Sequence, residues 1–460
     1  MGLIGIFLSL GLLMYLAYRG INVLILAPIM ALLATLFAGG LPLLATYTQV
    51  FMPALGNYLL QFFPLFLLGA IFGKLMADSG SARTIAEWFT DRMGASRSIA
   101  AVVAACGVLT YGGVSLFVVA FAVYPIANAL FRRSDTPKRL LPAALALGSF
   151  TFAMTAFPGT PAIQNAIPMP YFGTTPFAAP IYGTLAGIGM LAFGTLWLNR
   201  RRAAANARGE GYGEHPRTDA DADETEAETP SIGVAMLPVV TVIVLNAVFT
   251  YLVIPAMDTG YLAEERYGAA TIDDVKGIWA IIASLVVSIV LCTALNRQRF
   301  RDLKESYNKG TMGSLLPVFN TASEVGYGAV IASLPAFMVV RDAVLGLSSN
   351  PLISSAVATN VLAGITGSAS GGMSITLEAL GDQFLQQAQS SGIDPDILHR
   401  VVALSSGGFD ALPHNGAVIT LLAITGLTHK QSYGDIFVVA VLVPFAITVA
   451  VVLSASLLMV

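Results

Sequence analysis

Apolar runs long enough to cross a bilayer recur from one end of the chain to the other, with short polar segments between them. The runs are continuous rather than alternating, which favours spanning helices over the strands of a membrane barrel. Ten runs are predicted as spans: Leu3–Tyr18, Ile21–Gly40, Tyr47–Met76, Leu140–Phe157, Phe177–Leu198, Ile232–Ile254, Ile278–Leu295, Met312–Val340, Val401–Leu422 and Ile436–Leu458. The pattern therefore predicts an all-α polytopic membrane protein.

Two further apolar stretches, residues 98–131 and 353–385, are each interrupted by small polar residues. The interruptions read TYGGVS (Thr110–Ser115) and TGSASGGMS (Thr366–Ser374), and each leaves two arms that are too short to span comfortably. We predict that both stretches are re-entrant hairpins, with two thin spans each as the alternative. The chain would then have roughly 12 to 14 membrane segments.

Segments of the two halves of the chain match in order and at a nearly constant offset. LGAIFGKL (Leu68–Leu75) parallels YGAVIASL (Tyr327–Leu334), GGVS (Gly112–Ser115) parallels GGMS (Gly371–Ser374), and AFPGTPA (Ala156–Ala162) parallels ALPHNGA (Ala411–Ala417). Such matches predict two inverted-topology repeats. The first repeat covers residues 1–198, with a broken helix at about 140–172, and the second covers 232–460, with a broken helix at about 401–422. The polar segment between them, residues 199–231, is predicted to be a flexible cytoplasmic linker.

The placement of charge is informative because only 11% of the residues are charged, against about a quarter in soluble chains. Lys and Arg concentrate at the cytoplasmic ends of spans. Placing Arg200–Arg202 inside puts most other basic loops inside and the acidic loop around Asp258–Asp274 outside. Five crossings and one hairpin per repeat make both termini external, although Arg341, His399 and Arg400 fit this topology less well.

Irregular backbone within a bilayer must be buried in protein or line a cavity, so the interruptions are candidate binding sites of a secondary transporter. Helix N-termini attract anions, glycines let a ligand approach the backbone, and hydroxyl groups complete the shell. The predicted substrate-binding residues are Thr110, Gly112, Gly113, Ser115, Gly159, Thr160, Gln164, Asn165, Ser370, Gly371, Gly372, Ser374, His414 and Asn415. Ser115 and Ser374 are expected at equivalent tip positions. The alternative is that these polar groups only satisfy backbone groups freed by the breaks.

Ionisable groups deep within the predicted spans are few, and none is Lys or Arg, which favours a small monoanion over a phosphate ester as substrate. Asp410, His414 and Glu324 are the candidates for carrying a coupling proton. Alternatively, Asp410 caps a half-helix, His414 satisfies a loop carbonyl and Glu324 caps or pairs near a break. The four His residues are spread apart without an H-E-x-x-H motif, so we expect neither a metal site nor an enzyme, and no cofactor or nucleic-acid partner.

Several of these stretches resemble the gluconate permease (GntP) family of bacterial carboxylate symporters, and within it the D-3-hydroxybutyrate permease-type members. They are YLAYRG, FFPLFLLGAIFGKLMADSG, LTYGGVSLFVVAFAVYPIA, FPGTPAIQNAIPMPYFGTTPFAAP, SGGMSI and LPHNGAVITLLAITGLTHKQSYGDI. The resemblance covers nearly the whole chain except the linker.

The resemblance implies proton-coupled uptake of a small hydroxy-monocarboxylate, such as D-3-hydroxybutyrate or gluconate, across the bacterial inner membrane. It also implies the ion-transporter superfamily, whose members are usually dimers with a moving, elevator-type transport domain. A sodium-coupled carboxylate or dicarboxylate transporter is the alternative. Sodium-coupled relatives carry Ser-Asn-Thr triplets at the hairpin tips, where this chain has GGVS and GGMS.

Overall fold

The computed structural model describes residues 1–215 and 229–457, and every regular element among them is helical. Most of the acidic part of the predicted linker and the end of the last predicted span, Leu458, lie outside these described residues. Five helices are long and apolar enough to cross a membrane, or up to seven when two sharply bent helix pairs are each counted as one span. The five are Leu43–Asp78, Pro180–Asn206, Ile232–Ala256, Ile272–Leu295 and His429–Leu457.

The order of elements in the first half recurs in the second. The first half contains α1 (Gly2–Tyr18), α2 (Val23–Ala38), α3 (Leu43–Thr46), α4 (Met52–Asp78), α5 (Ser81–Met93), α6 (Ser98–Tyr111), α7 (Leu116–Arg133), α8 (Leu141–Ser149), α9 (Phe152–Thr155), α10 (Ile163–Ala166), α11 (Pro168–Phe172) and α12 (Pro180–Asn206). The second contains α13 (Ile232–Val248), α14 (Ile272–Leu295), α15 (Leu303–Ser333), α16 (Phe337–Leu345), α17 (Pro351–Thr366), α18 (Ala369–Ser390), α19 (Pro395–Phe409), α20 (Gly416–Thr425), α21 (His429–Phe437) and α22 (Val443–Leu457). Each half runs through a helix pair, a long helix, a short helix, a hairpin, a broken helix and a final long helix.

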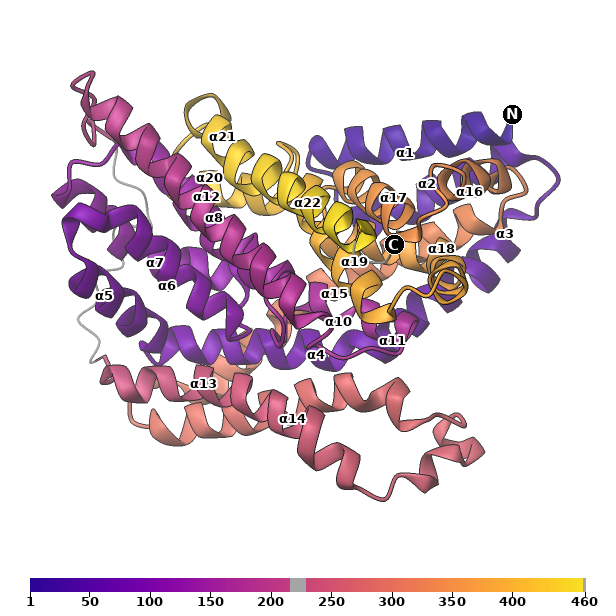
Figure 1. Ribbon diagram of the computed structural model, residues 1–460, viewed down its shortest axis with the longest axis horizontal. Helices are drawn as coiled ribbons and strands as arrows, with labels where there is room; N and C mark the ends of the chain where they lie inside the picture. Colours follow the sequence, from indigo (N-terminus) through magenta and orange to yellow (C-terminus); the bar gives the residue numbers. More distant parts are fainter. Residues whose placement is uncertain (216–228, 458–460) are drawn as a thin grey trace.

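The long helices α4 and α15 pack against each other at the centre of the molecule, between the pair α1 and α2 and the pair α13 and α14 (Figure 1). Their close approach depends on small residues, since a Cβ atom on Gly310 would lie 2.8 Å from the Cα atom of Ile71. The hairpin formed by α6 and α7 and the hairpin formed by α17 and α18 lie at opposite ends (Figure 1). This arrangement is the one that inverted repeats produce.

Two predicted bounds are wrong. The span predicted over Met312–Val340 is interrupted, because α15 ends at Ser333 and α16 turns away from it by 96°. Pro335 lies in the turn, and its ring removes the backbone N–H that a continuing helix needs. The linker predicted from residue 199 begins later, since α12 continues to Asn206.

The chain that follows α12 is held against the first hairpin rather than free. Glu210 pairs with the Arg139 guanidinium, which also donates to Asp435 at 2.9 Å. The Tyr212 hydroxyl donates to Asn128 near the base of α7. The hydrogen bond that Arg139 donates to Glu210 lowers the pKa of the Glu210 carboxyl. The first part of the predicted linker therefore ties the hairpin to α12 and α21.

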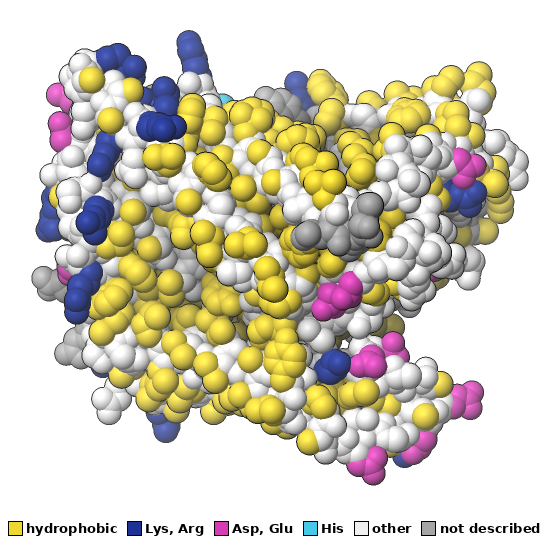
Figure 2. Space-filling view, in the orientation of Figure 1, with side chains coloured by type: hydrophobic (Ala, Val, Ile, Leu, Met, Phe, Trp, Pro, Cys, Tyr) yellow, Lys and Arg dark blue, Asp and Glu magenta, His cyan; other side chains and the backbone are white. Residues whose placement is uncertain are grey.

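The face shown in Figure 2 has a broad apolar band, with Lys and Arg gathered mainly at one end and Asp and Glu mainly at the other. Many large apolar side chains are exposed, such as Leu60 at 82% and Ile181 at 73% exposure. Such a band is unfavourable in water and is satisfied by lipid. The chain is a membrane-embedded, multi-pass protein.

Candidate functional site

The tip of the first hairpin is fastened to the first broken helix. Gly113 has a φ of +92°, which favours glycine, and a Cβ atom there would lie 2.8 Å from Pro161. The Tyr111 hydroxyl donates to the Pro158 carbonyl at 2.7 Å. At the end of α6, the buried Thr110 hydroxyl has no hydrogen-bond partner among the described residues. The tip is thus held by the Pro161 ring and by one side-chain hydrogen bond, and it leaves the Thr110 hydroxyl unused.

The tip of the second hairpin is fastened in the same way to the second broken helix. Gly367 has a φ of +63°, and Ser368 caps α18 by accepting from the Gly371 N–H at 3.0 Å. The Asn415 amide donates to the Gly367 carbonyl at 2.8 Å, while its oxygen caps α20 at Val418. Asn415 therefore joins two helix ends.

The expectation that Ser115 and Ser374 occupy equivalent tip positions is wrong. Ser115 directly precedes α7, whereas Ser374 lies in the second turn of α18. Helix α18 continues through the GGMS sequence because its glycines are used for packing. A Cβ atom on Gly372 would lie 2.2 Å from the backbone of Ala363 in α17.

The polar residues of the first break mostly satisfy backbone groups. Gly159 donates its N–H to the Pro176 carbonyl at 2.8 Å. Asn165 donates to the carbonyls of Thr160 at 3.0 Å and Pro176 at 2.8 Å. Gln164 makes no side-chain hydrogen bond in the part of the chain that the structure describes. Of the polar residues predicted here, Gln164 is buried and is the one whose side chain makes no hydrogen bond within the described part of the chain.

The second break leaves polar atoms without partners. Asp410 is 5% exposed, follows directly after α19, and has one carboxylate oxygen without a hydrogen bond. His414 is half-buried beside the end of α17, and its Nε2 atom is buried without a partner. A Cβ atom on Gly367 would lie 2.8 Å from the His414 ring. His414 and Asn415 thus lie together at the second tip.

Helix α19 carries a buried cation, Arg400, directly before the predicted span Val401–Leu422, at one of the positions that fit the predicted topology less well. His399 and Arg400 are both fully buried. The Arg400 guanidinium donates to the Ala178 carbonyl at 2.8 and 3.1 Å and reaches the carbonyls of Thr155 and Pro176 at 3.4 and 3.5 Å. It satisfies carbonyl groups freed where the first broken helix unwinds.

A cluster of five polar residues, which we call the Glu324 cluster, lies between α4, α15 and α18. It contains Tyr58, Thr321, Glu324, Ser370 and Ser374. The Tyr58 hydroxyl, one oxygen of Glu324 and the Ser374 hydroxyl are buried there without hydrogen-bond partners. The Thr321 and Ser370 hydroxyls lie 3.3 Å apart. Sequence reasoning missed Tyr58 and Thr321, since a lone Tyr or Thr in an apolar run carries no signal.

The two halves interlock around these sites. Helix α10 of the first break packs against α18 and α19, and α20 of the second break packs against α7. Where α19 is kinked at Gly407, a Cβ atom would lie 2.8 Å from Thr155 at the end of α9. Apart from the residues of the first tip and the break beside it, the predicted residues fall into two groups, one on or beside α10 and α18 and one at or near the second tip.

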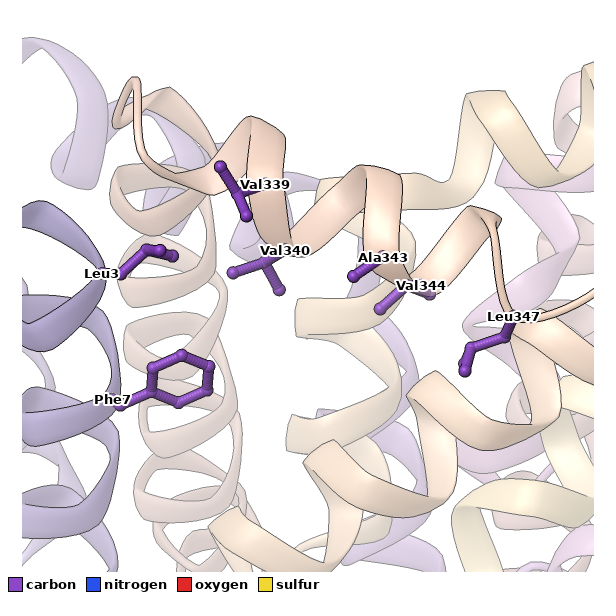
Figure 3. Close-up of a pocket in the computed structure, with 7 residues that line it drawn as sticks. All are labelled: Leu3, Phe7, Val339, Val340, Ala343, Val344 and Leu347. Atoms are coloured by element: carbon purple, nitrogen blue, oxygen red, sulfur yellow. The ribbon is translucent and has the colours of Figure 1, made fainter.

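An apolar groove elsewhere on the molecule belongs to neither group. It has a volume of about 290 Å³ and lies between α1 and α16 (Figure 3). Its lining is Leu3, Phe7, Val339, Val340, Ala343, Val344 and Leu347. With no polar group to orient a carboxylate, it fits an acyl chain of the surrounding lipid and not a small anion.

Comparison with known proteins agrees with this architecture. The chain is 43% identical to the uncharacterized transporter YxjC of Bacillus subtilis (strain 168), over 96% of both chains. Its structure resembles the Alcanivorax borkumensis YdaH transporter, with a TM-score of 0.56 at 14% identity over 88% of this chain and 86% of that one. It also resembles Neisseria gonorrhoeae MtrF, described as one of a class of antimetabolite efflux pumps, with a TM-score of 0.57 at 11% identity over 94% and 93%.

These two structural likenesses show a shared transporter fold, and the relatives are transporters rather than enzymes. The model of the GntP family permeases matches residues 1–458. The chain belongs to the GntP permease family.

Proposed function

We propose that this permease takes up a small hydroxy-monocarboxylate, such as D-3-hydroxybutyrate or gluconate, by symport with protons. The proposal includes a homodimer in the bacterial inner membrane and an elevator-type movement that carries the hairpins. The basic end of the molecule faces the cytoplasm, so that the linker is inside and both termini are outside, because Lys and Arg gather at cytoplasmic ends.

The observation that carries the substrate proposal is the start of α7 at the first tip. Ser115 makes no capping hydrogen bond with its side chain, and the first turn of α7 contains no acidic residue. Gly73 of α4 lies against this turn, since a Cβ atom there would be 3.5 Å from the Ser115 nitrogen. Free N–H groups, a partial positive charge and the unused Thr110 hydroxyl suit a carboxylate with a neighbouring hydroxyl.

A larger or more highly charged anion fits less well. The buried Arg400 is committed to backbone carbonyls, so helix ends and hydroxyls supply the attraction. These groups balance about half a charge per helix end, which is suited to a monoanion. We propose that Gln164 on α10 and the hydroxyls of α18, the helix that packs against α10, contact the rest of the substrate.

Proton coupling is supported by three acid–base candidates, the buried Glu324 and Asp410 and the half-buried His414. Each has a buried side-chain atom without a hydrogen-bond partner among the described residues. A sodium-coupled carboxylate or dicarboxylate transporter is the alternative, and neither tip carries the Ser-Asn-Thr triplet of sodium-coupled relatives.

The test is uptake of labelled D-3-hydroxybutyrate into proteoliposomes, with gluconate and lactate as competitors. An inward proton gradient is imposed with and without sodium. We expect accumulation driven by protons alone and abolished by a protonophore. Accumulation that needs sodium would replace the proton part of the proposal, and equilibration without accumulation would indicate a passive channel.

A further inference from the structure

Glu324 is enclosed by protein on all sides, where a bare charge is unfavourable. Its side chain is 3% exposed, and no ion pair reaches it among the described residues. A Cβ atom on Gly371 would lie 1.7 Å from its Oε2 atom, so the carboxyl group rests directly on the first turn of α18. That turn is the positive end of a long helix, but a helix end compensates only part of a buried charge. The site needs either a proton or a bound cation.

The groups around Glu324 favour the proton. Tyr58 and Ser374 present hydroxyls that have no hydrogen-bond partner, and Thr321 and Ser370 already contact each other. A hydroxyl group can both donate and accept, so one shell can serve the carboxylic acid and the carboxylate in turn. Buried polar groups that stay unpaired in one conformation point to a change of protonation or of partner in another.

We propose that Glu324 takes up the coupling proton from the outer solution, and that the site holds one negative charge at a time. With Glu324 neutral, that charge is the carboxylate of the substrate at the start of α7. After the substrate and the proton have left, it is the Glu324 carboxylate, which rests on the first turn of α18. The inference rests on the proposed proton-coupled uptake of a monocarboxylate and deepens it.

We expect the coupling proton to bind Glu324 rather than the other titratable groups near it. On the elements packed around it they are Tyr47, Tyr58, Tyr171, Tyr327, Arg341, Asp342, Glu378 and Asp382. Arg341 and Asp342 pair with each other, and Glu378 accepts from Tyr171 at 3.2 Å further along α18.

The first experiment measures binding of D-3-hydroxybutyrate to the purified protein by calorimetry at several pH values. If one proton must bind to Glu324 first, the apparent affinity of the wild-type protein for the substrate falls up to about 100-fold over the two pH units above the pKa of this group. Glu324→Gln is fixed in the neutral form, so its affinity should change less than about twofold over the same range. Glu378→Gln, on the same helix, is the matched control and should behave like the wild type. Wild-type binding that does not depend on pH overturns the inference, as does a Gln variant that follows the wild type.

The second experiment does not depend on the substrate. Infrared difference spectroscopy between acidic and basic pH should show a carboxylic acid band that Glu324→Gln removes and Glu378→Gln retains. Retention of every such band in Glu324→Gln overturns the assignment of the proton to this residue. If the band behaves as expected but neither D-3-hydroxybutyrate nor gluconate binds, the proton site stands and the proposed substrate falls. Binding that requires sodium, and that Glu324→Gln abolishes, overturns the choice of proton over cation.

Discussion

Replacing Arg400 with Met tests whether the buried guanidinium holds the unwound part of the first broken helix in place. Met has a similar length and no donor, so the carbonyls of Ala178 and Thr155 lose the Arg400 donors, while the Pro176 carbonyl keeps its bonds from Gly159 and Asn165. An unsatisfied buried polar group costs about 1–3 kcal/mol. The bonds to Ala178 are short and the other two are long. We therefore expect a loss of about 3–5 kcal/mol in the free energy of unfolding, comparable to breaking a buried ion pair.

The assay is thermal unfolding of the purified protein in detergent. Unfolding entropy scales with chain length, at about 2 cal/mol/K per residue, so a loss of this size lowers Tm by at least about 3–5 °C. Arg341→Met is the control, because Arg341 is part of an exposed pair that contributes less than about 1 kcal/mol. Arg400→Lys should lie between the two, since one ammonium group cannot reach all three carbonyls. A Tm for Arg400→Met within about 1 °C of the Arg341 variant would refute the reasoning.

Three further predictions follow from single contacts. Gly371→Ala should abolish transport, because the added methyl group would collide with Glu324, whereas Gly416→Ala adds its methyl group at an open position and should not. Equal transport rates in the two variants would contradict the packing of Glu324 on α18. Asn415→Ala removes the cap of α20 and the hydrogen bond to Gly367 at the second tip, and should lower the free energy of unfolding by about 1–3 kcal/mol. Denaturation in detergent measures this loss, and an unchanged stability would contradict the role of Asn415 in joining the two helix ends. The hydrogen bond from Arg139 lowers the pKa of Glu210 in the folded protein, so the stability that Glu210 contributes is present at neutral pH and is lost as the pH falls through its folded-state pKa. Glu210→Gln should therefore flatten the acid side of the profile of Tm against pH. An unchanged profile would disprove the pairing in solution.

Sequence reasoning located the helical architecture and the interruptions within a few residues, because both have local causes. Continuous apolar runs predict spans, and Gly or Pro at a break leaves its mark on neighbouring residues only. The hairpin predicted at residues 98–131 is α6 and α7, and the one at 353–385 is α17 and α18. The breaks predicted from AFPGTPA and ALPHNGA are also where α9 and α19 end.

The contacts that define the sites could not be predicted, since they join residues far apart in the chain. Arg400 precedes an apolar run and looks like a loop residue until the carbonyls of residues 155–178 are placed beside it. The glycines before Ser374 look like another break, although they are there to let α17 and Glu324 approach α18. In both cases tertiary packing decides the role of a residue, and local composition does not.

The guanidinium of Arg400 has a consequence for how the protein is made. Synthesis proceeds from the N-terminus, so the carbonyls of Thr155 and Ala178 are synthesised long before Arg400 exists. Until then the nascent first half exposes unpaired backbone groups at a depth where water is scarce. The first half should therefore be less stable in the membrane until α19 is synthesised and Arg400 binds these carbonyls. Truncation products that stop before α19 should be substrates for membrane quality control rather than stable fragments.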